Sequence, residues 1–156
     1  MTKSKIYKYI IDAKIAHLTW VRKAEHLIDG LPVTEGMIPL DPTFCTFGKW
    51  LYNEGSNLRK IKDIDDNLNK IEKYHNNLHQ HYAAIYEIFF ILPKEESFLK
   101  KIIRFSSQRV STKNLQLAKN HFSDLIASSN QLIYAINLLK KQIKALDFTD
   151  IKTMYS

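Results

Sequence analysis

Three long segments of this chain repeat an apolar or aromatic position every three or four residues, and this repeat constrains the fold more than any other feature. In the first segment the repeating positions are Ile10, Ala13, His17, Trp20, Ala24 and Leu27. The spacing gathers these side chains on one face of an α-helix, and such a face is buried against other helices. The repeat predicts a helix from about residue 4 to residue 29, ending near Gly30.

The repeat returns in two later segments. One begins after residue 60 and ends before Pro93, and the other occupies residues 113–146. Strand-like alternation is nearly absent, and 156 residues are enough for one buried core. We therefore expect a single all-α domain over residues 1–156, an antiparallel four-helix-bundle-like fold in which residues 113–146 form the closing helix.

Two connecting segments are predicted to contain shorter helices. Residues 93–112 form an extra helix in this prediction. Residues 29–42 form a loop rich in proline and glycine, and a short helix follows in which Asp41 caps the first turn and Gly55 marks the end. Cys45 then lies near the N-terminus of this additional short helix, where the helix dipole lowers the pKa of a thiol.

Histidine takes the place of an apolar residue at two positions of the buried faces, His17 and His75. A buried imidazole destabilises a helical core unless its nitrogens are hydrogen-bonded or bound to a metal. His79 follows His75 by one helical turn, so both rings can reach one ion. With Cys45, the only cysteine, they make a complete tetrahedral ligand set for zinc. Four protein ligands leave no position for water, which favours a structural or sensing metal over a hydrolytic one.

The residues around these positions resemble the chemoreceptor zinc-binding (CZB) domains of bacteria. The motif elements are HLTW from His17, CTFGKW from Cys45 and HNNLH from His75 to His79, and they occur in the order of the family. The motif region covers about residues 10–90. The resemblance implies that His17, Cys45, His75 and His79 bind one Zn2+ per chain in a four-helix-bundle domain that senses and does not catalyse.

The resemblance also implies how such a domain works. In the family these domains are commonly homodimers located beside chemoreceptor signalling regions or diguanylate cyclases, and they transmit zinc occupancy or oxidation of the zinc-bound cysteine. It therefore implies a homodimer with a signalling partner from a chemoreceptor or diguanylate cyclase pathway. We expect no output domain within these 156 residues. The signal is expected to leave through a partner protein or a change of oligomeric state.

Neighbouring residues are predicted to support the site. Gly48 allows close approach of two backbones, and Trp20 and Trp50 form an apolar wall. The ring N–H groups of the histidines need acceptors. The candidate carboxylates for this role are Asp12, Asp41 and Glu72.

Composition argues against several other partners. The formal net charge is +7, but the lysines are mixed with acidic residues along every segment, which argues against a nucleic-acid surface. The longest apolar stretch, residues 83–92, is interrupted by Glu87 and is too short to span a bilayer. The single cysteine and the absence of a secretion-signal pattern favour a cytoplasmic protein without membrane insertion.

Two other interpretations remain open from the sequence. In one, the chain is a metal-free helical adaptor or dimerisation protein whose histidines are ordinary core residues. In the other, Lys140, Lys141 and Lys144 bind nucleic acid or an anionic membrane surface. An enzyme is not expected, because no nucleophile and base pair, phosphate loop or open metal site is found. The remaining histidines that we interpret as surface or packing residues include His26, His81 and His121.

Overall fold

The structure is a computed structural model that describes residues 2–33, 39–92 and 110–147. Its elements are α1 (Lys3–Ile28), α2 (Thr46–Tyr52), the 3-10 helix η1 (Glu54–Lys60), α3 (Lys62–Tyr86), the π-helical turn η2 (Glu87–Ile91) and α5 (Thr112–Ala145). The described residues contain no strand, so the predicted all-α bundle is confirmed. The extra helix predicted at 93–112 falls on residues outside the described ranges as far as residue 109.

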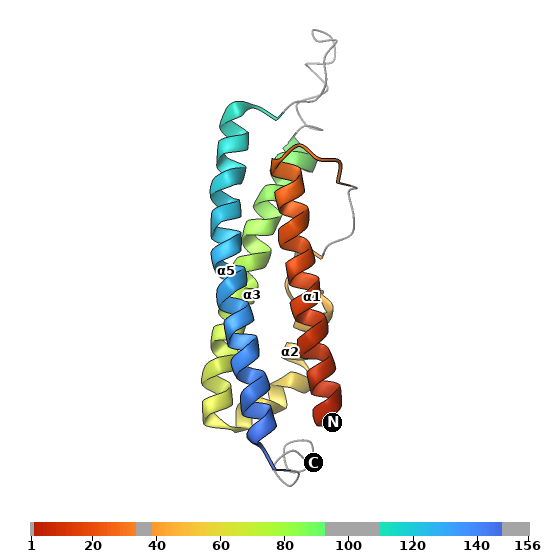
Figure 1. Cartoon of the computed structure of the whole chain (residues 1–156), viewed down its shortest axis with the longest axis vertical. Helices are drawn as coiled ribbons and strands as arrows, with labels where there is room; N and C mark the ends of the chain where they lie inside the picture. Colours follow the sequence, from red (N-terminus) through yellow and green to blue (C-terminus); the bar gives the residue numbers. More distant parts are fainter. Residues whose placement is uncertain (1, 34–38, 93–109, 148–156) are drawn as a thin grey trace.

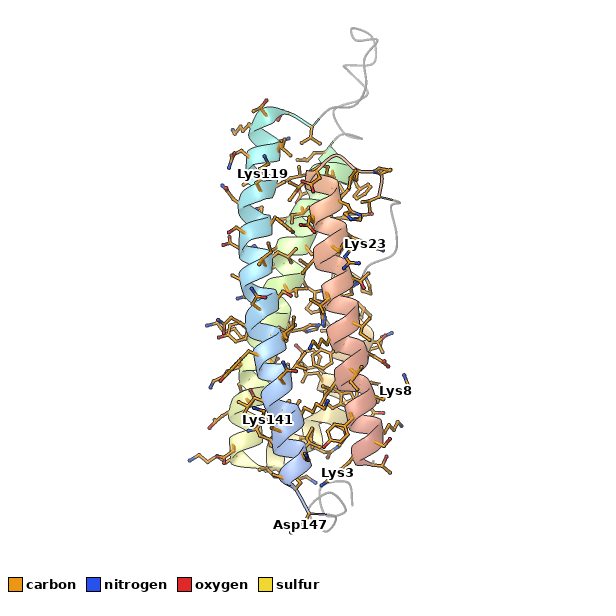
Figure 2. All side chains as sticks on the ribbon, viewed as in Figure 1. Lys3, Lys8, Lys23, Lys119, Lys141 and Asp147 are labelled. Atoms are coloured by element: carbon orange, nitrogen blue, oxygen red, sulfur yellow. The ribbon has the colours of Figure 1, made fainter. Side chains whose placement is uncertain are left out.

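The three long helices lie side by side, and Figure 1 shows that α1 and α3 run in one direction while α5 runs in the opposite direction. The chain returns from the end of α1 to the start of α3 by way of α2 and η1. Of these, α2 packs against α1 and η1 packs against α3. The antiparallel helix α5 contacts both α1 and α3. Side chains from these elements fill the interior along the length of the bundle (Figure 2).

Local sequence explains where the long helices begin and end. Thr2 caps α1 by accepting a hydrogen bond from the backbone N–H of Lys5, and Ser111 caps α5 in the same way. After α1 the chain turns at Gly30, whose φ of 73° lies in the left-handed region that glycine adopts without strain. The predicted bounds of the first and last helices are therefore confirmed within one residue.

The short helix begins later than predicted, and Asp41 does not cap it. The carboxylate of Asp41 accepts hydrogen bonds from the backbone N–H and the hydroxyl of Thr43, at 2.8 and 2.7 Å. Because this local turn uses the carboxylate, the helix starts only at Thr46, and Cys45 is its N-cap residue. Gly55 does not end the helix either, because it lies beyond Tyr52, inside η1.

A polar contact joins α3 to α5 inside the apolar core. The buried side-chain amide of Asn67 donates hydrogen bonds to the carbonyl of Ala135 at 3.0 Å and to the side chain of Gln142 at 2.9 Å. Gln142 in turn donates to the carbonyl of Asp63 at 2.8 Å. These bonds fix the register of the two helices relative to each other. Within the described ranges, no helix has both the length and the hydropathy needed to cross a membrane.

Candidate metal centre

Four side chains from three elements meet in the core of the bundle. His17 projects from the middle of α1, Cys45 is the N-cap residue of α2, and His75 and His79 project from successive turns of α3. Their potential ligand atoms all lie within 4.8 Å of one another. None of the four residues is more than 4 % exposed. The sequence interpretation grouped these same residues, and the structure brings them together.

The distances inside this cluster are close to those of a tetrahedral zinc site. Cys45 Sγ lies 3.2 Å from His75 Nε2, and His75 Nε2 lies 3.1 Å from His79 Nε2. Zinc bond lengths imply separations of roughly 3.3 Å between two nitrogen ligands and roughly 3.6 Å between nitrogen and sulfur. Three imidazoles and a thiol are also donors that suit zinc better than magnesium or calcium. The cluster therefore fits one zinc ion.

The backbone orients one of the rings. His79 Nδ1 lies 3.2 Å from the carbonyl oxygen of Leu40. A carbonyl can only accept, so Nδ1 carries the proton and donates, which leaves the Nε2 lone pair directed toward the cluster. This is the arrangement by which metal-ligating histidines are usually held.

The carboxylates considered as acceptors have other partners. Glu72 receives a hydrogen bond from Arg59 at 2.8 Å, and Asp12 pairs with Lys8 at 2.6 Å. The Asp41 carboxylate binds Thr43. The acceptor for His79 is thus a backbone carbonyl, which no residue type in the sequence could have indicated.

Several buried nitrogens of the cluster lack a hydrogen bond. Within the described part of the chain, neither ring nitrogen of His17 makes a hydrogen bond of normal geometry, nor does Nδ1 of His75, although the backbone of Ala13 lies near enough to His17 to oppose the effect of burial on its pKa. A buried polar atom without a partner costs about 1–3 kcal/mol. A metal bound at His17 would satisfy one of its nitrogens. This deficit argues that the His17 ring is placed to bind something at the centre of the cluster.

Burial keeps the three imidazoles neutral, which is the state that binds a metal. It lowers the pKa of His17 to about 3 and that of His75 to about 2, and the neighbouring imidazoles contribute to both shifts. Burial also lowers the pKa of His79. A neutral imidazole offers a free lone pair at ordinary pH.

The thiol behaves differently from the sequence expectation. Burial raises the pKa of Cys45, and the backbone N–H groups of Gly48 and Phe47 only partly oppose this. The predicted lowering by a helix N-terminus is therefore wrong for the metal-free protein, because loss of solvation outweighs the short helix. A zinc ion held by Cys45 would reverse this balance, since a coordinating thiol is deprotonated.

Aromatic rings enclose the cluster. Trp20 lies edge-on to the rings of His17 and His79, with centroids 4.9 and 4.8 Å apart. The ring of Phe47 lies edge-on to His75 at 5.3 Å. Trp50 instead stacks on Phe47 at 5.6 Å. The predicted wall thus includes Trp20 directly and Trp50 indirectly. The sequence interpretation missed Phe47, although it stands inside the quoted CTFGKW motif.

Gly48 allows the backbone approach that was predicted for it. A Cβ atom at this position would lie 1.8 Å from the carbonyl oxygen of Pro42. The N–H of Gly48 donates to Cys45 Sγ at 3.1 Å. Glycine at this position therefore brings the residues before α2 close enough to hold the sulfur in place.

The three lysines considered for nucleic-acid or membrane binding lie on the last turns of α5, outside this cluster. With Tyr7 and Tyr134 they line a surface hollow of about 790 Å³. Figure 2 shows Lys141 on this part of α5, toward the end of the molecule where Lys3 and Asp147 are labelled.

Comparison with known proteins finds a family to which part of the chain is similar. Residues 17–86 match the family model of the chemoreceptor zinc-binding domain, CZB. No curated protein and no solved structure matches the chain. The matched segment starts at His17 and includes all four residues of the cluster. Residues 17–86 of the chain are therefore similar to the chemoreceptor zinc-binding domain family, in agreement with the resemblance of the sequence motifs.

Proposed function

We propose that this protein is a zinc-responsive sensory domain in which His17, Cys45, His75 and His79 bind one Zn2+ per chain. The observation that carries the proposal is the convergence of their donor atoms within 4.8 Å at a buried position. The nitrogens of His17, which make no hydrogen bond of normal geometry, support it further. Burying such an imidazole would destabilise a helical adaptor that binds no metal.

The placement of the four residues suggests how zinc occupancy changes the protein. They lie on α1, α2 and α3, and none lies on α5. Zinc supplies bonds that join three separate elements, and a ligand that binds only the folded state stabilises it by mass action. Without it, α1 is held by packing and by Lys3, whose ammonium group donates to the backbone carbonyls of Lys144 and Leu146. The N-terminus of α2 is held by packing and by the contact between Cys45 and His75. The helices α3 and α5 keep their own hydrogen-bonded contact at Asn67.

Zinc level is the input that the burial favours. Cys45 is only 4 % exposed, and the susceptibility of a thiol to oxidation follows its exposure and thiolate character. Oxidation by peroxide or hypochlorite is the second candidate, because a zinc-bound Cys45 is a thiolate. An oxidant then has to reach the sulfur through transient opening of the residues around α2.

We further propose that the output is a change in protein association and not catalysis. The apolar side chains of Ile11, Ile15 and Leu18 form an exposed stripe along α1, and Ile15 is 59 % exposed. The stripe lies on the same helix as His17. A homodimer through α1, or a signalling partner bound there, would respond to zinc because the metal holds α1 in place. A cytoplasmic location is part of this proposal, since a zinc-bound thiol suits a reducing compartment.

Metal analysis tests the zinc proposal directly. The full chain is purified without a metal-affinity tag, and its metal content is measured by mass spectrometry for wild type, Cys45→Ala, His75→Ala and the control His26→Ala. We expect about one zinc per chain in wild type and His26→Ala, and strong loss in the other two. A folded wild type that takes up no added zinc would leave the helical adaptor as the better interpretation.

A second measurement separates the two inputs. Association between protein chains, thermal stability and zinc release are followed while zinc is removed by a chelator. The same quantities are followed in parallel while peroxide is added to the zinc-loaded protein. We expect the chelator to act at once and peroxide to act slowly, because Cys45 is buried. Zinc release by peroxide as rapid as release by the chelator would favour the oxidant as the input.

A further inference from the structure

A second pair of histidines bridges two helices on another side of α3. His81 on α3 and His121 on α5 face each other with 3.2 Å between their Nδ1 atoms and 5.5 Å between their ring centroids. Both side chains are partly buried. The two residues are far apart in sequence, so only the packing of α5 on α3 brings them together.

We propose that His81 and His121 form a second metal site, open to solvent, for a divalent transition metal such as zinc. The separation of their nitrogens matches the 3.1 Å between His75 Nε2 and His79 Nε2 in the first cluster. For an ion about 2.0–2.1 Å from both Nδ1 atoms, the Nδ1–metal–Nδ1 angle would be roughly 100°. That angle suits tetrahedral or square-planar coordination by imidazole.

The chemistry of this pair differs from that of the first cluster. In the metal-free pair one Nδ1 donates its hydrogen to the other. Metal binding needs both Nδ1 atoms free of hydrogen, so the donating ring shifts its proton to Nε2 and the rings turn about their Cβ–Cγ bonds. The partial exposure of both side chains allows this rotation and proton exchange with water.

The second site holds its ion less tightly than the first. Within the described ranges, no third histidine, cysteine or carboxylate joins the pair, so water completes the coordination. Residues 79 and 81 are about 200° apart around an α-helix, which directs the two sites to different neighbours of α3. The first site faces α1 and α2, and the second ties α3 to α5.

A cobalt titration distinguishes the two sites in the full chain. Co2+ bound to a thiolate gives a charge-transfer absorption in the near ultraviolet, whereas Co2+ bound only to imidazole and water does not. Wild type, His81→Ala, His121→Ala and the control His26→Ala are titrated with Co2+ under reducing conditions, and binding is followed by absorption and by equilibrium dialysis. His26 is a partly buried histidine at the far end of α1 from Lys3, outside both clusters.

We expect wild type and His26→Ala to bind one equivalent with the charge-transfer band and a weaker second equivalent without it. The second equivalent should be lost in both His81→Ala and His121→Ala, while the band of the first equivalent shows that the variants still fold. Saturation of wild type at one equivalent, or a second equivalent that survives both substitutions, overturns the proposal. Absence of the band in wild type would instead count against the zinc proposal for the first cluster.

Discussion

The close contact between Gly48 and Pro42 makes one residue decisive for the position of the sulfur. A methyl group at Gly48 would meet the Pro42 carbonyl at 1.8 Å, and this atom is backbone that cannot rotate away. We expect Gly48→Ala to displace Cys45, to lower the free energy of unfolding by about 2 kcal/mol or more, and to reduce zinc affinity. Chemical denaturation and competition with a zinc chelator measure the two effects.

Gly30 supplies the matched control for this substitution. It has a φ of 73° but open space around its Cα, so Gly30→Ala strains only the backbone. The expected cost is about 1 kcal/mol with unchanged zinc affinity. Equal effects of the two substitutions on zinc affinity would show that the contact with Pro42 does not position the sulfur.

The depressed pKa values of the buried imidazoles make the metal-free protein sensitive to acid. His17 and His75 titrate at about 3 and about 2 when folded, against a usual value of 6.5. Between these limits the unfolded chain binds more protons than the folded chain, so stability falls as the pH decreases below about 6.5. We expect up to about 1.4 kcal/mol per pH unit for each imidazole. Urea unfolding of chelator-treated protein at neutral pH and at about pH 5 tests this, and equal midpoints would contradict it.

The identities and spacing of the residues predicted which side chains form the candidate site. The hydrogen-bond partner of His79 and the direction of the pKa shift of Cys45 depend instead on the residues packed around them. The four residues could be grouped in advance because histidine at a buried helical position, with a second histidine one turn later, needs a partner. The Leu40 carbonyl could not be predicted, since every residue has one. The pKa of Cys45 was predicted in the wrong direction because burial depends on the packing of distant helices.

Among the elements, α3 and α5 form a pair that does not depend on the metal cluster. We expect Asn67→Ala to lower the free energy of unfolding by about 1–3 kcal/mol, because Asn67 bonds two groups of α5. The loss should be the same with one equivalent of zinc, which fills only the tighter first cluster, and with chelator, because none of the four clustered residues lies on α5. Denaturant unfolding in both conditions measures it.

Asn137 provides the comparison on α5. It is exposed, so Asn137→Ala should change stability by about 0.5 kcal/mol or less. A cost of Asn67→Ala that differs between these two conditions would mean that the metal of the first cluster also organises the contact between α3 and α5.

The elements differ in how well their sequence defines them. The long helices follow from a repeat sustained over many turns, so a single residue cannot change their bounds much. The short helix α2 depends on one capping choice, and the local turn between Asp41 and Thr43 decided that choice. Hydrogen bonds from a side chain to the backbone two residues away compete with the start of a helix. They cannot be predicted from the pattern of apolar residues.

The molecule as a whole is expected to dimerise through the stripe of Ile11, Ile15 and Leu18. Replacing Ile15 with Lys places a charge in the middle of this surface and should convert the dimer to monomer, as measured by sedimentation of the zinc-loaded protein. Tyr134→Lys on α5, at a position that is 72 % exposed, should leave the dimer intact. A wild type that sediments as a monomer would exclude the homodimer.

The order of the elements along the chain determines at which stage of synthesis the residues of the metal cluster are complete. All four residues of the cluster lie between His17 and His79, whereas α5 begins only at Thr112. During synthesis the chain emerges from its N-terminus, so α1, α2 and α3 are complete while α5 is still being translated. If zinc binds as proposed, the growing chain can capture it before the last helix covers α1 and α3. The supply of zinc at the ribosome would then decide which form of the bundle each new molecule first adopts.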